Sequence, residues 1–330
     1  MRLAILGAGA WGTALGVALS SRHQISLWSR DPAQSRTLAA DRVNARYLPD
    51  VAIPAGVLIT SQLQLAIDSG ALIVIAVPTS ALRETMKLIV SAGSSAGVVW
   101  LCKGFESGSA KFPHQVAEEE LPPAQPRAAL SGPGFAGEVA RGLPAAVTLA
   151  SHDPRFAAFA SRELHTGRLR VYSSDDLVGV ETGGAVKNVI AIAAGVCDGL
   201  QLGASARAAL ITRGLAEMTR LGVRLGARAE TFMGLAGVGD LMLTSTSDLS
   251  RNRRVGLQLA QGRPLAAILA ALGHVAEGVY TAREVLRISK QLGVDMPIAS
   301  AVSQLLDGTT SAQELVESLL QRGPKSESVG

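Results

Sequence analysis

The sequence predicts an α/β fold, with a doubly wound, mainly parallel sheet in the N-terminal half and an all-α C-terminal domain. Three observations predict this class. A glycine-rich turn follows the first apolar run, strand-like runs then alternate with helical patterns, and the second half consists of long segments rich in alanine and leucine. The chain has 330 residues, of which 48% are apolar, and this is enough to bury a full core.

The first half is predicted to alternate strands and helices. Its strand-like runs are almost continuously apolar, as in parallel strands buried on both faces. We expect strands at Leu3–Leu6, Gln24–Arg30, Ala71–Pro78, Gly97–Gly104 and Ala128–Gly134. Helical spacing indicates helices from Trp11, over Ala81–Val90 and over Lys111–Leu121.

From about Leu177 onward the pattern becomes helical, with no convincing strand. The predicted helices are Val178–Leu200, Ala204–Leu225, Arg254–Gln261, Thr281–Gln291 and Ala312–Gln321. Good N-cap residues at Ser173–Asp176 place the boundary there. We therefore expect one domain at 1–174, a second at 175–322, and a polar, disordered tail at 323–330.

Composition excludes several classes of protein. A net charge of +4 is too small for binding nucleic acid by bulk attraction. The apolar runs are well short of the roughly 20 residues that span a bilayer, and the first residues do not have the continuous apolar core and cleavage site expected of a signal peptide. Cys102 and Cys197 are interpreted as core thiols, and the five histidines are too scattered for a metal site. We expect a cytoplasmic protein that has no metal, binds no nucleic acid and does not insert into membranes.

The stretch "LAILGAGAWG" contains the pattern G-x-G-x-x-G as Gly7, Gly9 and Gly12, after a predicted strand and at the start of a helix. In this position Gly7 permits the turn, Gly9 lets the backbone approach a pyrophosphate, and Gly12 allows close helix packing. The helix N-terminus attracts the anion. The pattern predicts a Rossmann-type dinucleotide site.

The end of the second strand bears on the choice of dinucleotide. Ser29 and Arg30 come before Asp31 in "SLWSRD". An arginine here can pair with the 2′-phosphate of NADP, whereas an acidic residue binds the ribose hydroxyls of NAD. We therefore favour NADP(H), with NAD(H) possible through Asp31; the alternative is that Arg30 is a solvated charge at a strand end.

Two lysines are candidates for chemistry. Lys103 follows an apolar run with no acidic neighbour in sequence, so it is either a point charge for an anionic substrate or a solvated strand-end lysine. Lys187 lies in a helix beside Gly183, Gly184 and Ile190, on a face that should be dry. Desolvation lowers a lysine pKa toward neutrality, as an acid/base for an alcohol-to-ketone conversion requires. Snorkelling to solvent is the alternative.

The stretch "SDLSRNRRVG" follows a glycine-rich turn that ends at Asp240. If Ser250 caps a helix that begins at Arg251, backbone N–H groups, a hydroxyl, a guanidinium and the Asn252 amide can converge on one phosphate. A solvated basic face is the alternative. We expect Arg253 and Arg254 to face water or the fold.

Taken together, "GAGAWGTAL", "CKGFE", "SGPGFAGEV", "GGAVKNVIAIAAG", "GLAGVGDLMLT", "SRNRRVG" and "AEGVYTA" resemble the bacterial NAD(P)-dependent glycerol-3-phosphate dehydrogenases. The resemblance implies reversible reduction of dihydroxyacetone phosphate to sn-glycerol 3-phosphate for phospholipid synthesis, with Lys187 as acid/base. The substrate positions that it implies are Lys103, Gly132, Gly134, Asp240, Ser250, Arg251 and Asn252. The cofactor positions that it implies are Ala10, Trp11, Arg30, Lys103, Ala136, Arg251, Val275 and Glu277.

One position departs from the family. Gly134 stands where the family usually has Ser or Thr, so a hydroxyl contact to substrate is missing. Two other functions stay open from the residues alone: a β-hydroxyacid-type dehydrogenase, and a protein that senses NADP(H) without turnover. A homodimer is plausible for the family.

Overall fold

The computed structural model describes residues 1–68, 72–272 and 276–321. The chain divides into two compact units, which are described separately below. Unit 1 comprises Met1–Cys102 and Lys111–Leu177, and unit 2 comprises Lys103–Ala110 and Val178–Gly330. The short segment Lys103–Ala110 thus interrupts unit 1, and nothing in its local sequence pattern indicates this.

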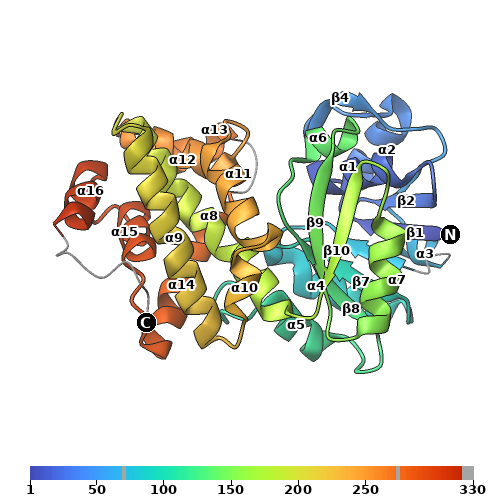
Figure 1. Ribbon diagram of the computed structural model, residues 1–330. Coiled ribbons are helices and arrows are strands. Elements are labelled where there is room, and N and C mark those ends of the chain that lie inside the picture. Colours follow the sequence, from blue (N-terminus) through green and yellow to red (C-terminus); the bar gives the residue numbers. More distant parts are fainter. Residues whose placement is uncertain (69–71, 273–275, 322–330) are drawn as a thin grey trace. The chain divides into compact units, whose positions relative to one another are not determined.

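Unit 1 is built on an eight-stranded sheet with the order β10-β9-β8-β7-β6-β1-β2-β5 (Figure 1). Every neighbouring pair is parallel except β8 and β9. The strands are β1 (Arg2–Leu6), β2 (Gln24–Trp28), β5 (Leu58–Thr60), β6 (Leu72–Ile75), β7 (Gly97–Trp100), β8 (Arg127–Ser131), β9 (Ala145–Ala150) and β10 (Leu169–Ser174). A separate antiparallel pair consists of β3 (Val43–Asn44) and β4 (Leu48–Ala52). The chain starts in the middle of the sheet, so the strand order reverses beside β1, where open sheets bind ligands.

Helices cover this sheet and complete its core. They are α1 (Ala10–Leu19), α2 (Pro32–Asp41), α3 (Leu63–Ile67), the short 3₁₀ turn η1 (Thr79–Ala81), α4 (Leu82–Ser91), α5 (Pro113–Glu120), α6 (Ala136–Ala140) and α7 (Pro154–Leu164). The side chains of Leu72, Val74 and Val99 in the central strands are fully buried, as their unbroken apolar runs predict. The doubly wound, mainly parallel sheet is confirmed.

Several elements of unit 1 were not predicted: strands β3, β4, β5, β9 and β10, and helices α2, α3, α6 and α7. Strand β10 is the edge strand and carries exposed Arg170 and Tyr172, so its sequence lacks the apolar run of a central strand. Strand β9 runs antiparallel to β8, which makes the sheet mixed at this side. Helix α7 follows Asp153, whose carboxylate caps it by accepting hydrogen bonds from the N–H groups of Arg155 and Phe156.

Unit 2 is helical throughout its described regular elements, as predicted (Figure 1). Its elements are α8 (Leu177–Gly199), α9 (Ala204–Arg224), α10 (Ala229–Phe232), the π-helical turn η2 (Leu235–Gly239), α11 (Asp240–Thr246), α12 (Arg251–Ala260), α13 (Leu265–Leu272), α14 (Glu277–Leu292), α15 (Pro297–Leu306) and α16 (Ala312–Leu320). Helices α10, α11, α13 and α15 were not predicted. Helix α12 begins one turn earlier than the predicted Arg254, because Ser250 caps it. Helix α14 likewise begins at Glu277 and not at Thr281.

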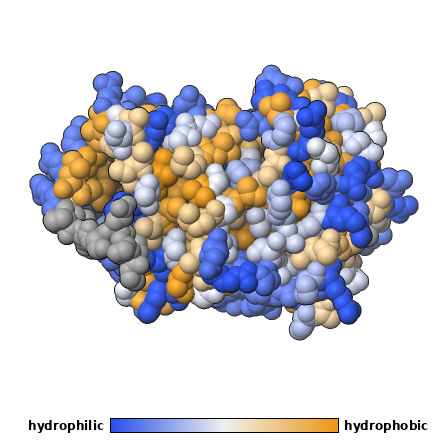
Figure 2. All heavy atoms as spheres, viewed as in Figure 1, coloured by the Kyte–Doolittle hydropathy of each residue, from blue (hydrophilic) through white to orange (hydrophobic). Residues whose placement is uncertain are grey.

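Helix α8 forms the centre of unit 2. Glycines let a neighbouring helix approach it closely: a Cβ on Gly195 would lie 2.0 Å from the Arg253 carbonyl oxygen, and one on Gly256 would lie 2.0 Å from that of Ile192. Within the described residues, α8 alone is long and apolar enough to cross a membrane. Its sequence contains no long unbroken apolar run, because Glu181 and Lys187 interrupt it. Of its most apolar window, 94% is buried, as in a core helix. Figure 2 shows both hydrophilic and hydrophobic residues on the visible face of each unit.

A buried carboxylate joins two helices of unit 2. Glu217 on α9 is 2% exposed and accepts hydrogen bonds from the backbone N–H groups of Ile298 (2.7 Å) and Ala299 (3.3 Å) in the first turn of α15. It thereby satisfies donors that a helix N-terminus otherwise leaves free. Burial raises the pKa of Glu217 to about 7, against the opposing effect of these two N–H groups.

Candidate active site

Two lysines share one buried carboxylate in unit 2. Lys187 on α8 donates hydrogen bonds to Oδ1 of Asp240 and, at 3.1 Å, to Oγ1 of Thr244. Lys103 donates to Oδ2 of Asp240 at 2.7 Å. The Asp240 side chain is only 2% exposed and that of Lys187 8%, so the cluster lies out of bulk water. Lys187 is buried and does not snorkel to solvent, which agrees with the dry face predicted from its neighbours.

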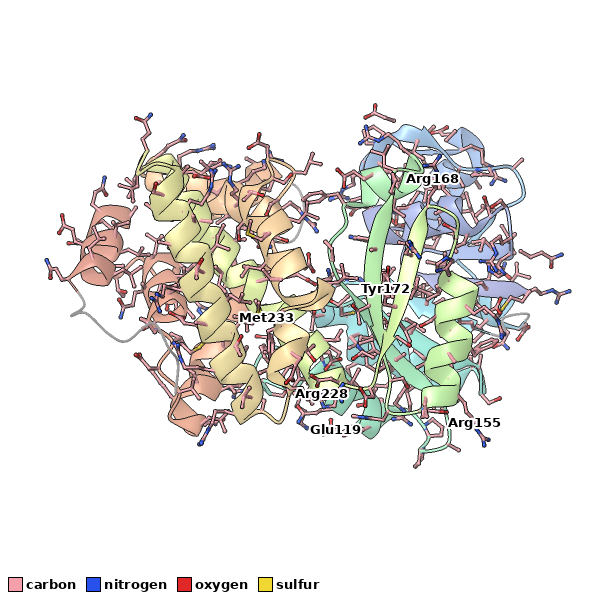
Figure 3. All side chains as sticks on the ribbon, viewed as in Figure 1. Glu119, Arg155, Arg168, Tyr172, Arg228 and Met233 are labelled. Carbon is pink, nitrogen blue, oxygen red and sulfur yellow. The ribbon has the colours of Figure 1, made fainter. Side chains whose placement is uncertain are left out.

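Glycines bring the carboxylate to the lysine. A Cβ on Gly183, one turn before Lys187, would lie 2.2 Å from the Ala236 carbonyl oxygen, so only glycine lets the turn η2 lie against α8. Within η2, a Cβ on Gly237 would lie 2.1 Å from the carbonyl oxygen of Phe232. Phe232 is fully buried and anchors the turn, whereas the next residue, Met233, is 69% exposed (Figure 3). The glycine-rich turn therefore delivers Asp240 beside Lys187.

Burial and charge set the protonation of this cluster. Burial lowers the pKa of Lys187 to about 7, although the Asp240 carboxylate by itself raises it. Burial alone would raise the pKa of Asp240, but Lys103 and Lys187 together hold it below its ordinary value. At neutral pH Asp240 is a carboxylate, and Lys187 can both give and take a proton.

The position of Lys103 argues against the alternative of a solvated strand-end lysine, because its side chain is only 17% exposed. Lys103 has no acidic neighbour along the chain, yet Asp240 lies against its ammonium group in space. Its segment, Lys103–Ala110, belongs to unit 2 and is held there at Gly108, whose N–H donates to Glu284 and whose carbonyl oxygen accepts from Arg287. Lys103 thus joins the carboxylate cluster as a second cation.

Two asparagines, Asn188 and Asn252, are hydrogen-bonded to each other. The Asn252 amide donates to Oδ1 of Asn188 at 2.9 Å, and its oxygen accepts from the N–H of Gly278 at 3.1 Å. Asn188 directly follows Lys187, and Gly278 directly follows Glu277 at the start of α14. Both the nitrogen and the oxygen of the Asn252 amide therefore hydrogen-bond within the protein. Contact with substrate would have to use the second N–H of the amide.

The N-terminus of α12 carries the other expected phosphate ligands. Ser250 is the N-cap and its hydroxyl accepts from the N–H of Arg253 at 3.2 Å. The side chain of Arg251 is exposed. As expected, the remaining two arginines face the fold and water respectively: Arg253 is buried in ion pairs and Arg254 is exposed.

The glycine-rich turn of unit 1 has the geometry that a dinucleotide needs. Gly7 has φ of 118°, which favours glycine, and a Cβ on Gly12 would lie 1.8 Å from the Gly7 carbonyl oxygen. Nothing lies within 4 Å of a Cβ on Gly9, the N-cap of α1, so its backbone is open to a pyrophosphate. Ala10 and Trp11 form the first turn of that helix.

The remaining expected cofactor and substrate positions of unit 1 lie at strand ends. Gly132, with φ of 130°, follows β8, and Gly134 lies against the Trp11 indole, 3.2 Å from it if a Cβ is added. Ala136 begins α6 and packs with α1. Arg30 follows β2 and is exposed.

Three further positions, Asp31, Val275 and Glu277, were expected to contact the cofactor. Asp31, the alternative ligand for ribose, caps α2 by accepting from the N–H of Ala33. Val275 lies outside the described residues, and Glu277 begins α14. In the part of the chain that the structure describes, no group of three or more His, Cys, Asp or Glu side chains could hold a metal ion.

One residue of the cluster was missed from the sequence. Thr244 lies one turn after Asp240 on α11, and its hydroxyl accepts from Lys187 and lies 3.4 Å from the Asp240 carboxylate. The spacing of four positions on a helix is the signal that would have found it.

Two family models match most of the chain. The one described as NAD-dependent glycerol-3-phosphate dehydrogenase N-terminus matches residues 2–157, and its C-terminal counterpart matches residues 176–317. The chain belongs to the NAD-dependent glycerol-3-phosphate dehydrogenase family. The N-terminal model covers most of unit 1 and also the segment Lys103–Ala110 of unit 2, and the C-terminal model covers most of the rest of unit 2.

Individual members of the glycerol-3-phosphate dehydrogenase family are similar over almost their whole length. The glycerol-3-phosphate dehydrogenase (NAD(P)+) of Nitrosospira multiformis is 58% identical, over 99% of both chains. That of Dechloromonas aromatica is 56% identical, again over 99% of both chains. The crystal structure of glycerol-3-phosphate dehydrogenase from Coxiella burnetii has a TM-score of 0.93 and 40% identity, and covers 97% of this chain and 99% of that one. D-mandelate dehydrogenase, at 16% identity and a TM-score of 0.61, shares the fold alone.

Proposed function

We propose that this protein catalyses the reversible, NAD(P)H-dependent reduction of dihydroxyacetone phosphate to sn-glycerol 3-phosphate. The observation that carries the proposal is the buried cluster in which Lys187, held by Asp240, has a pKa of about 7. Membership of the glycerol-3-phosphate dehydrogenase family supports the same substrate pair. The product would supply the backbone of phospholipids.

Lys187 is the acid/base of this proposed reaction. During reduction its ammonium group donates a proton to the carbonyl oxygen of the substrate as negative charge develops there. During oxidation the neutral amine removes the proton of the alcohol. Asp240 keeps the amine oriented through its hydrogen bond, and the second cation, Lys103, stabilises the developing oxyanion.

The phosphate of the substrate is assigned to the start of α12. The helix N-terminus offers backbone N–H groups and a favourable dipole, and the exposed guanidinium of Arg251 can pair with two phosphate oxygens. Ser250, Asn252 and Gly132 are proposed to contribute further contacts, and Gly134 contributes backbone only. This arrangement separates the proton chemistry at Lys187 from the binding of the charged end.

The cofactor is assigned to unit 1, with the Gly7–Gly12 turn, Ala10, Trp11 and Ala136 around it. When bound, the nicotinamide supplies or accepts the hydride. The exposed Arg30 after β2 favours NADP(H), because its guanidinium suits a 2′-phosphate, and Asp31 permits NAD(H). Lys103, Arg251, Glu277 and Val275 stay proposed cofactor ligands.

Steady-state kinetics test this proposal. The protein should oxidise NADPH, and more slowly NADH, when dihydroxyacetone phosphate is added, and 3-hydroxy acids should not support the reverse reaction. Activity confined to hydroxy acids would contradict the substrate assignment, and a strong preference for NADH would contradict the role of Arg30. Cytoplasmic location and a homodimer stay predictions.

A further inference from the structure

Arg253 on α12 is a buried charged residue that the proposed reaction does not use. Its side chain is 9% exposed, whereas Arg251 and Arg254 on the same helix are exposed. Arginines are rarely buried unless they are paired, so the partners of Arg253 indicate what it does.

The guanidinium of Arg253 joins two carboxylates. Nε and Nη2 contact Oδ2 of Asp198 at 2.8 and 2.6 Å, and Nη1 contacts Oδ1 of Asp248 at 2.6 Å. The other oxygen of Asp198 accepts from Arg207 on α9 at 2.7 Å. The Asp198 carboxylate is therefore paired with two cations, Arg253 and Arg207.

These partners lie at two informative places. Asp248 is in the turn directly before α12, and Asp198 is near the C-terminal end of α8, about three turns after Lys187 on the same helix. The backbone N–H of Arg253 also donates to the hydroxyl of Ser250. One residue therefore fastens the turn and the first turn of α12 to the helix that carries Lys187.

The ion pair between Arg253 and Asp248 is expected to contribute little to the stability of the fold. The Asp248 side chain is 95% exposed, and ion pairs with an exposed partner contribute little to stability. What it does fix is the path of the turn that presents Ser250 and Arg251. A contact of this kind acts on position more than on stability.

We propose that Arg253 is a positioning residue for the phosphate of the substrate, which acts by clamping the turn at Asp248 and helix α8 at Asp198 with one guanidinium fork. The inference rests on the proposed function. It adds to that function a residue that touches neither substrate nor cofactor, and a specific reason for an arginine: a lysine cannot bridge two carboxylates through a rigid planar fork.

The test compares Arg253→Lys with Arg254→Lys, a matched change at the exposed neighbouring position. For Arg253→Lys, KM for dihydroxyacetone phosphate and the inhibition constant of sn-glycerol 3-phosphate should both rise about 10-fold, while kcat changes less than about twofold, because the grip on phosphate is misplaced and Lys187 is not. For Arg254→Lys neither constant should move. Asp248→Asn, at an exposed position that does not threaten folding, should raise KM about threefold.

The outcomes separate the inference from its premise. If the wild-type protein does not reduce dihydroxyacetone phosphate, the proposed function fails. If it does, but Arg253→Lys lowers kcat and leaves KM unchanged, or Asp248→Asn leaves KM unchanged, the positioning role of Arg253 is overturned and the proposed function stands.

Discussion

Lys187 on α8 donates a hydrogen bond to Asp240, the first residue of α11, and both side chains are buried. Two effects act on the pKa of Lys187 in opposite directions. Burial lowers it by favouring the neutral amine, and the Asp240 carboxylate raises it by favouring the ammonium ion. The balance leaves the pKa of Lys187 at about 7, where an acid/base works in both directions of a redox reaction at neutral pH.

Replacing Lys187 by alanine should remove most turnover and spare cofactor binding. Loss of the proton step is expected to lower kcat by about 10²–10⁴-fold. The dissociation constant for NADPH should change less than about threefold, because Lys187 is not among the proposed cofactor ligands. Lys290→Ala, at an exposed helical lysine of α14, is the control. Turnover that survives in Lys187→Ala would remove this residue from its role.

The pH dependence of the two directions should be opposite. Reduction needs the ammonium form of Lys187, so its kcat/KM should be level below pH 7 and fall about tenfold per pH unit above it. Oxidation needs the neutral amine, so its kcat/KM should rise with pH up to about 7 and then level off. Parallel pH profiles in the two directions would contradict the assignment.

Asp240→Asn should shift the pH dependence of kcat/KM in both directions of the reaction to lower pH. The Asp240 carboxylate raises the pKa of Lys187, and removing its charge takes that support away. The change also leaves two lysines without their counter-charge, which should destabilise the protein by about 3–5 kcal/mol. Kinetics between pH 5 and 8 measure the shift, and a limb that stays in place would show that burial alone sets the pKa.

Glu217 should make stability fall as the pH rises. Its pKa in the folded protein is about 7, above the ordinary 4.5, so between these values the folded state binds more protons than the unfolded state. Glu217→Gln stays neutral and lacks this slope. The free energy of unfolding of the wild type relative to the variant should therefore decrease by roughly 2 kcal/mol from pH 5 to pH 8, as measured by urea titration. Parallel stability profiles would refute this.

Gly195→Ala should separate α12 from α8. The new Cβ would lie 2.0 Å from the Arg253 carbonyl oxygen, a backbone atom that cannot rotate away, so we expect a loss of about 1–3 kcal/mol in thermal or urea unfolding. Gly16→Ala is the control, because the nearest atoms to its Cβ lie 3.7 Å away and alanine favours a helix. Equal stability of the two variants would contradict the close packing of α8 and α12.

The parts of the fold predicted from the sequence are those with strong local patterns. The central strands and the Gly7–Gly12 turn were predictable because continuous apolar runs and fixed glycine spacing have few alternative structures. Strand β10 was missed because an edge strand exposes side chains such as Tyr172 to solvent. For helix α12 the sequence allowed two starts, Arg254 from helical spacing and Arg251 with Ser250 as its cap, and the structure shows the second.

The candidate site was predictable residue by residue but not in its pairing. Lys187 could be placed on a dry face from its neighbours on the helix. Its carboxylate partner could not be found, because Lys187 and Asp240 are 53 positions apart and Lys103 and Asp240 are 137 positions apart. Arg253 was expected to face water or the fold, and only the tertiary structure shows the two carboxylates that it joins.

The short segment Lys103–Ala110 has an evolutionary consequence. Because it belongs to unit 2 while its flanks belong to unit 1, the chain crosses between the units three times, after Cys102, after Ala110 and after Leu177. A single recombination point therefore cannot transfer unit 2 as a whole. A break after Leu177 would transfer residues 178–330 but not Lys103. A fusion of two genes at Leu177 would place the codon for Lys103 in the gene for unit 1, although Lys103 belongs to unit 2.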